Sequence, residues 1–337
     1  MTSTANAAGT FSTTSAVELA VVERSGFIES RHSGSAIVID QHADVLRSLG
    51  DPSAPVFLRS TMKPFQAIAV MNAGVGLRGA AAVLATASHS GTQRHVSVVR
   101  SILAQAGLTE TALQCPADWP ADGAARDELL KDNGDKSPIY MNCSGKHAAM
   151  LLACVTNNWP IESYLDPEHP LQHAILDVVE RFTGERPVAS GIDGCGAPVH
   201  ALSLAGLARG ISRIRTSSPS SPFAIYRNAG ILCQAVLEDG WALDGPGRAN
   251  TVVIDRLGVF AKLGAEGVMV MAAPDGTTVA LKMLDGSLRA ATLVGLSLLV
   301  DAGALSRDAV EEIRPELSLD VLGGTGVVGE IRVSPTL

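Results

Sequence analysis

The sequence predicts an α+β fold in which an antiparallel sheet, built from strands at both ends of the chain, packs against helices of a mostly helical middle region. Three observations support this prediction. Short segments rich in valine and isoleucine lie near the N-terminus, a hairpin pattern lies near the C-terminus, and apolar residues between them repeat with helical spacing. The first and last segments are therefore expected to share one sheet.

The elements can be followed in order along the chain. Ala16–Arg24 and Ser35–Asp40 are rich in β-branched residues and predict two early strands, which could pair. A helical pattern begins at Thr61. Further helices are expected at about 95–107, 124–131, 145–156, 168–184, 198–209, 222–238, 289–301 and 306–314. Val268–Ala272 and Thr278–Met283 flank a Pro-Asp-Gly turn and predict a hairpin.

The chain reads as one folded unit preceded by a short tail. No internal repeat and no long Pro- or Ser-rich linker divides residues 16–337, which predicts a single domain. Residues 1–15 are small and polar and predict a flexible tail. The tail lacks the basic and apolar stretches of a secretory signal, so a cytoplasmic location is expected.

Charge and composition exclude several classes of protein. The net charge is −8 and no run of basic residues occurs, which argues against a nucleic-acid binder. The longest apolar stretch, at about 290–300, is roughly half of a membrane span, so no transmembrane helix is expected. The 5 cysteines are an odd number and widely spread, which favours reduced thiols over a disulfide framework.

The segment Arg59–Phe65 carries the first chemically suggestive pattern. Proline is tolerated only in the first helical turn, so Pro64 places a helix start within a residue or two of Ser60. Free backbone N–H groups at a helix start favour a developing negative charge on the serine oxygen. Lys63 lies three residues later on the same face and could take the serine proton. The alternative is an ordinary N-capping serine followed by a surface lysine.

Two further sequence patterns could contribute residues to the same site as Ser60 and Lys63. Thr86–Thr92 contains Ser88 and Ser90 around a histidine, and it reads either as a helix-capping turn or as a second serine delivered to the first. Lys262 is followed two residues later by Gly264 at a strand start, where a glycine would let a substrate approach the backbone. The order Ser-x-x-Lys, Ser-x-Ser, Lys-x-Gly resembles the three-part arrangement of serine β-lactamases and penicillin-binding proteins.

Two cysteine motifs precede predicted helices. Cys143 lies in Asn142–His147, and Cys195 lies in a glycine-rich turn that Asp193 and Pro198 flank. A thiol at a helix N-terminus has a lowered pKa and is a better metal ligand. Two lone cysteines about fifty residues apart match no common zinc spacing, so small buried thiols remain the alternative to a metal site.

Taken together, these motifs resemble the Rhizobium etli-type L-asparaginases, also called asparaginase II proteins, over nearly the whole chain. The resemblance rests on seven short motifs: Arg59–Pro64, Ala87–Ser90, Asn142–His147, Asp193–Cys195, Lys262–Ala265, Asp285-Gly286 and Gly323–Gly329. It implies a serine-β-lactamase-like fold, with residues 16–337 as the catalytic domain, and hydrolysis of L-asparagine to L-aspartate and ammonia by a cytoplasmic homodimer.

The same resemblance implies roles for individual residues. Ser60 would be the nucleophile and Lys63 its base, with Ser88 and Lys262 as a second Ser–Lys pair. Zinc would be held by Cys143, Lys146 and Cys195, while Arg59, His147 and Asp193 would line the substrate pocket. A β-lactam hydrolase or peptidase, and a non-catalytic binding protein on the same fold, are the alternative functions.

Overall fold

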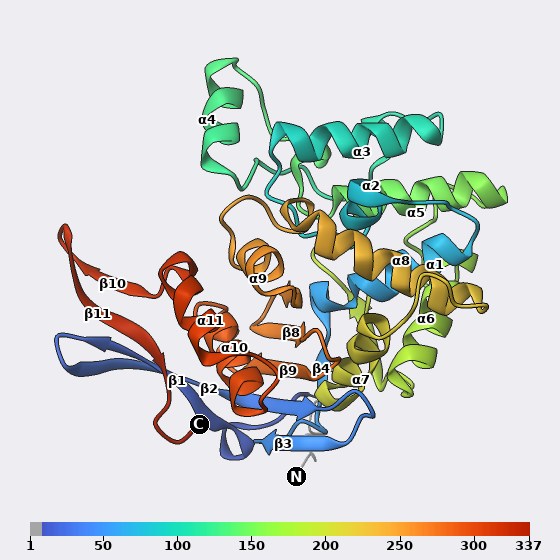
Figure 1. Ribbon diagram of the computed structural model, residues 1–337. Coiled ribbons are helices and arrows are strands. Elements are labelled where there is room, and N and C mark those ends of the chain that lie inside the picture. Colours follow the sequence, from blue (N-terminus) through green and yellow to red (C-terminus); the bar gives the residue numbers. More distant parts are fainter. Residues whose placement is uncertain (1–8) are drawn as a thin grey trace, which may run out of the picture.

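In the computed structural model, the described residues 9–337 form eleven α-helices and eleven β-strands (Figure 1). The predicted tail is described only in part, because residues 1–8 lie outside this range. In its described part, Phe11 is buried in the core and Thr13–Ser15 form a short 3₁₀ helix. The packed chain therefore begins before Ala16.

The main sheet combines strands from both ends of the chain. Its order is β10-β11-β1-β2-β9-β8-β7, with β3 pairing β2 beside this path, and all of its pairs are antiparallel. The strands are β1 (Val17–Arg24), β2 (Phe27–Ile39), β3 (Val45–Leu49), β7 (Phe260–Gly264), β8 (Val268–Ala272), β9 (Thr278–Met283), β10 (Asp320–Gly323) and β11 (Gly326–Val333). The predicted α+β fold, with N- and C-terminal strands in one sheet, is confirmed.

Helices form most of the middle of the chain, as predicted. They are α1 (Lys63–Asn72), α2 (Gly79–Leu84), α3 (Gln93–Gln105), α4 (Gly123–Lys131), α5 (Ser144–Asn157), α6 (Pro170–Thr183), α7 (Leu204–Arg215), α8 (Ala224–Glu238), α9 (Ala249–Leu257), α10 (Ala291–Asp301) and α11 (Arg307–Ile313). Figure 1 shows α1–α6 and α8 gathered away from the sheet, whereas α10 and α11 lie close to it. Within residues 9–337, no helix combines the length and apolar character needed to span a membrane.

The sheet places Lys262 on the side away from α10. Lys262 of β7 pairs with Val270, and the preceding residue Ala261 pairs with Met271. Successive strand residues point to opposite faces, so Lys262 and Met271 project from opposite sides. Met271 packs against Gly295 of α10. The side chain of Lys262 therefore points away from α10, toward the helical region.

A second sheet of three strands replaces part of a predicted helix. The prediction of a helix over 198–209 is wrong for its first half, because Pro198–Ser203 form strand β6 between β4 (Pro55–Phe57) and β5 (Ala189–Ile192). Helix α7 begins only after Ser203, whose side chain caps it by accepting from the Gly206 N–H. Most of β6 is buried, and a short apolar run of this kind does not distinguish a strand from a helix.

Candidate active site

The helix start predicted at Ser60 is present. A 3₁₀ helix over Arg59–Met62 continues into α1, and Pro64 lies in the first turn of α1. Ser60 is half-buried and makes no capping hydrogen bond, and Lys63 is only 1% exposed. The alternative of an N-capping serine and a surface lysine is therefore wrong.

The structure brings both lysines of the predicted pairs to one hydroxyl group. Lys63 Nζ lies 2.9 Å and Lys262 Nζ lies 3.0 Å from Ser88 Oγ. Each amine also donates to a backbone carbonyl, Lys63 to that of Ala87 and Lys262 to that of Leu263. The Ser60 hydroxyl forms no hydrogen bond with any residue in the described range, although it lies one turn from Lys63 on the same helix start.

The segment Thr86–Thr92 fits both interpretations given for it. Helix α3 is capped by Thr92, whose hydroxyl accepts from the N–H of His95 in a reciprocal capping box. The Ser88 side chain is not used for capping and bonds to Lys63 and Lys262 instead. The end of the segment therefore caps α3, as one interpretation expected, while its Ser88 reaches Lys63 of the first Ser–Lys motif, as the other expected.

Lys262 has an environment that favours its neutral form. It is fully buried on β7, and burial together with the nearby charge of Lys63 lowers the pKa of Lys262 to about 7, while Asp244 opposes this shift. A lysine with a pKa near neutrality is deprotonated in a large fraction of molecules and can accept a proton.

Gly264 permits the approach of β7 to the start of the first helix. A Cβ atom there would lie 3.1 Å from the Leu58 carbonyl oxygen and 3.1 Å from Thr61 Cγ2. The glycine was expected to make room for a substrate, but its nearest neighbours belong to the 3₁₀ helix region. Its effect is to bring the strand that carries Lys262 against the segment that carries Ser60.

The predicted metal ligands also meet. Lys146 Nζ donates to Cys195 Sγ at 3.1 Å, and the Cys143 thiol, which donates to Asn142 Oδ1 at 2.9 Å, lies close enough to the same sulfur to affect its pKa. The Nε2 atom of His147 is buried beside them without a partner in the described chain, while Nδ1 bonds to the hydroxyl of Tyr164 at 2.7 Å. The two sulfur atoms and the amine are the three predicted donors, and an amine binds zinc only when it is neutral.

The two thiols differ in the direction of their pKa shifts. The interaction with the Cys143 thiol lowers the pKa of Cys195, and the charge of Lys146 acts in the same direction against burial. The pKa of Cys143 is raised by its interaction with the Cys195 sulfur and by burial. The expected lowering is wrong for Cys143, which holds the N-cap position of α5 without a side-chain capping bond and whose pKa rises. The pKa of Cys195 is lowered as expected, but by its neighbours Cys143 and Lys146, because Cys195 precedes β6 rather than a helix.

No cluster of three His, Cys, Asp or Glu side chains suited to a metal occurs among residues 9–337, since the third donor here is a lysine. Burial alone would lower the pKa of Lys146, but the charges of Cys195 and Cys143 outweigh burial and raise it. Lys146 would therefore have to release a proton in order to bind zinc.

Arg59 and Asp193 form an ion pair beside Ser60. Arg59 Nε donates to Asp193 Oδ1 at 2.8 Å, and both side chains are largely buried. Arg59 has a φ angle of 49°, in the left-handed region that non-glycine residues adopt at a cost. A cavity of about 580 Å³ adjoins Arg59, with Glu266 and Lys282 as its other charged lining residues.

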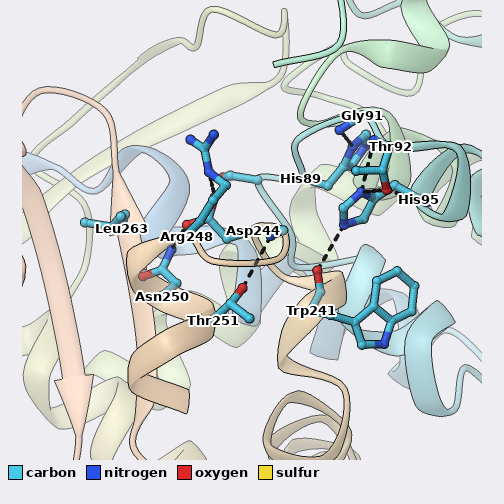
Figure 2. Close-up of polar contacts among 12 residues, drawn as sticks. His89, Gly91, Thr92, His95, Trp241, Asp244, Arg248, Asn250, Thr251 and Leu263 are labelled. Atoms are coloured by element: carbon cyan, nitrogen blue, oxygen red, sulfur yellow. Dashed lines mark hydrogen bonds and ion pairs between the residues drawn. The ribbon is translucent and has the colours of Figure 1, made fainter. Parts of the chain in front are cut away.

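Sequence reasoning missed His89 and Ser144, which join two motifs. The Gly91 N–H donates to His89 Nδ1 (Figure 2), so the ring proton lies on Nε2, which donates to Ser144 Oγ at 2.9 Å. Burial holds the pKa of His89 well below its usual value, so the ring is neutral. Their sequence signal was that each lies inside a motif, next to a residue that had been assigned a role.

Sequence reasoning also missed Asp244, which is buried in the turn before α9 and lies close enough to Lys262 to affect its charge. A glycine-rich turn, Asp244–Gly247, was the available signal.

Comparisons with known proteins agree with this description. The family model for L-asparaginase II matches residues 20–333. No curated protein matches the chain in sequence. Among solved structures, a beta-lactamase from Mycobacterium bovis is 16% identical with a TM-score of 0.44, over 81% of this chain and 95% of that one. A Bacillus glutaminase is 13% identical with a TM-score of 0.43, over 80% and 91% of the two chains. On the strength of the match over residues 20–333, the chain belongs to the L-asparaginase II family and is an amidohydrolase.

Proposed function

We propose that this protein hydrolyses L-asparagine to L-aspartate and ammonia through an acyl-enzyme formed on Ser60. The observation that carries the proposal is the contact of two buried lysines, Lys63 and Lys262, with the single hydroxyl of Ser88, next to a helix start that presents Ser60. Amide hydrolysis needs a nucleophile, a proton carrier and donors for the oxyanion. Family membership supports asparagine as the substrate.

In the proposed reaction, the proton of Ser60 is passed to the leaving amide nitrogen by the two lysines and Ser88. Ser60 Oγ attacks the carbon of the side-chain amide, and its proton passes to the Lys63–Ser88–Lys262 set, in which Lys262 is the group with a pKa near 7. The C–N bond then breaks as the same set returns a proton to the leaving NH₂ group, which departs as ammonia. Water attacks the ester carbon, releases L-aspartate and restores the Ser60 hydroxyl.

Arg59 and Asp193 supply the charges that a free amino acid requires. In this proposal the guanidinium binds the α-carboxylate of the substrate and the Asp193 carboxylate binds its α-ammonium group. Their mutual ion pair, at 2.8 Å, holds both side chains in place near Ser60 before substrate arrives.

Zinc is the second part of the proposal. Cys143, Lys146 and Cys195 would hold the ion, with His147 beside them, and a bound zinc would supply a positive charge that orients polar groups of the substrate. The Ser–Lys groups do not need it to activate Ser60. Removing zinc should therefore raise KM more than it lowers kcat, and elemental analysis of protein purified without chelator should find near-stoichiometric zinc.

One assay tests the proposed activity. Ammonia release is measured with L-asparagine and with L-glutamine, each with and without a chelator. Release from asparagine supports the proposal. If neither amide is hydrolysed while the β-lactam nitrocefin is, the protein is a β-lactam hydrolase instead. If none of the three reacts yet asparagine binds in calorimetry, the non-catalytic alternative is correct.

A further inference from the structure

The segment before α9 is attached directly to the candidate catalytic groups. The Ser88 N–H donates to the Leu243 carbonyl at 2.9 Å, so the turn that follows Leu243 lies against the serine that both lysines contact. Gly245 continues this contact, since a Cβ atom there would lie 2.3 Å from Ser90 Oγ. Asp244 lies between these two points of attachment.

Asp244 is a buried carboxylate held in one orientation (Figure 2). It is 4% exposed; its Oδ1 accepts from Arg248 Nε at 2.7 Å and its Oδ2 accepts from Asn250 Nδ2 at 3.1 Å. The guanidinium of Arg248 is half exposed to solvent, and the amide of Asn250 is neutral. The negative charge of Asp244 is thus only partly compensated by its hydrogen-bond partners.

Burying such a charge is unfavourable unless other charges offset it. Lys262 Nζ bonds to Ser88, whose backbone N–H bonds to Leu243, the residue before Asp244. The other charged or titratable groups that act on Lys262 are Lys63 on α1 and Cys143 and Lys146 at the start of α5. Asp244 is the carboxylate among the groups that act on Lys262. Its presence favours a proton on Lys262, which burial and Lys63 disfavour.

We propose that Asp244 is a positioning residue for proton transfer, whose fixed buried carboxylate stabilises the ammonium form of Lys262 while that lysine carries the proton taken from the serine hydroxyls. The proposal rests on the proposed function. The proton moves from a serine Oγ to Lys262 Nζ and later from Lys262 to the leaving NH₂ group. Asp244 acts only through its negative charge, which the Arg248 guanidinium partly compensates.

The experiment follows the titration of Lys262 directly in the full-length protein. Lysine labelled with ¹³C at Cε is observed by NMR over a range of pH, and the Lys262 signal is identified by its loss in Lys262→Arg. Asp244→Asn should lower the titration midpoint by about one pH unit, a tenfold change in the acid dissociation constant. Asp244→Glu should return it toward the wild-type value.

Two further variants sharpen the test. Arg248→Gln removes the half-exposed cation and should move the Lys262 midpoint upward, which keeps the proposal testable if Asp244→Asn does not fold. Asp239→Asn is the matched control, because Asp239 lies in the same segment and bonds to Trp241 instead. It should leave the midpoint unchanged.

The kinetic arm uses the same variants. The acidic limb of kcat/KM for asparagine should move to lower pH in Asp244→Asn, whereas a purely structural role would reduce activity equally at all pH values. A Lys262 midpoint that is unchanged or raised in Asp244→Asn, or lowered in Arg248→Gln, overturns the proposal. A wild-type enzyme that releases no ammonia overturns the proposed function alone, since the NMR titration still decides the role of Asp244.

Discussion

Ser88 is the residue on which the candidate chemistry converges. Its oxygen has two lone pairs and one proton, and the Nζ atoms of Lys63 and Lys262 lie 2.9 and 3.0 Å away. Two buried ammonium groups so close to one hydroxyl would repel each other strongly. One of the two amines is therefore expected to be neutral, in agreement with the lowered pKa of Lys262, and a neutral amine can accept a proton on behalf of Ser60.

Replacing each of the two serines in turn tests which one is the nucleophile and which one carries protons. Ser60→Ala should abolish turnover without measurable loss of stability, because the Ser60 side chain caps nothing. Ser88→Ala should slow turnover but still allow an acyl-enzyme, detected as added mass on the intact protein after rapid acid quench. Activity of Ser60→Ala within tenfold of wild type would move the nucleophile assignment to Ser88.

Replacing the lysines tests whether the set works as one unit. Lys63→Ala and Lys262→Ala should each reduce kcat severely, and the double variant should be little worse than either single variant. The measurement is a double-mutant cycle on kcat. Losses that add up on a logarithmic scale would show that the two lysines act independently.

The lowered pKa of Lys262 also predicts how stability varies with pH. Its pKa is about 7 in the folded protein and 10.5 when unperturbed, so between these values unfolding takes up a proton. Stability attributable to this residue therefore rises with pH, by at most about 1.4 kcal/mol per unit. Lys262→Met should be more stable than wild type at pH 7, and the gap in urea denaturation should narrow at pH 9. A constant gap would contradict the lowered pKa.

At the scale of elements, two glycines allow close packing around the site. Gly264 brings β7 against the 3₁₀ helix, and Gly145 brings the start of α5 against the end of α2, since a Cβ at Gly145 would lie 2.5 Å from the Leu84 carbonyl oxygen. The start of α5 carries Cys143 and Lys146. The mutual placement of the serine, lysine and cysteine motifs thus depends on the absence of a side chain at Gly264 and at Gly145.

Gly145→Ala should displace the start of α5, because the clash is with backbone that cannot rotate away. We expect a loss of about 1–3 kcal/mol in the free energy of unfolding and a marked fall in kcat/KM. The matched control is Gly123→Ala at the first position of α4, where a Cβ meets nothing within 4 Å. If the two variants behave alike in denaturation and assay, the close approach of α5 is unimportant.

At the scale of the whole molecule, the two ends of the chain are held in one sheet. Strand β1 lies between β2 and β11, and β2 is also paired with β9, so the sheet cannot be completed until the C-terminal strands are available. Large apolar side chains remain exposed at its outer end, on Phe27, Leu322 and Val327. Exposed apolar groups of this kind are consistent with association between copies.

A homodimer is therefore expected, in line with the family resemblance. Light scattering at micromolar concentration should report twice the mass of one chain. A monomer mass under these conditions would refute it.

The sequence by itself determined the local features. Pro64 set the helix start at Ser60, β-branched residues set the strands at both ends, and short motifs identified the residues that converge on Ser88 and Cys195. These are consequences of steric limits and side-chain periodicity, which act over a few residues.

Only the tertiary structure decided how those groups are connected and charged. In the folded protein Lys63 bonds to Ser88 and residues 198–203 form a strand. The pKa values of Cys143 and Cys195 shift in opposite directions. The fold also brings Asp244 to Lys262. The physical reason is that burial, charge interactions and strand pairing depend on segments far apart in the chain. A local sequence pattern does not specify which distant segments will come into contact.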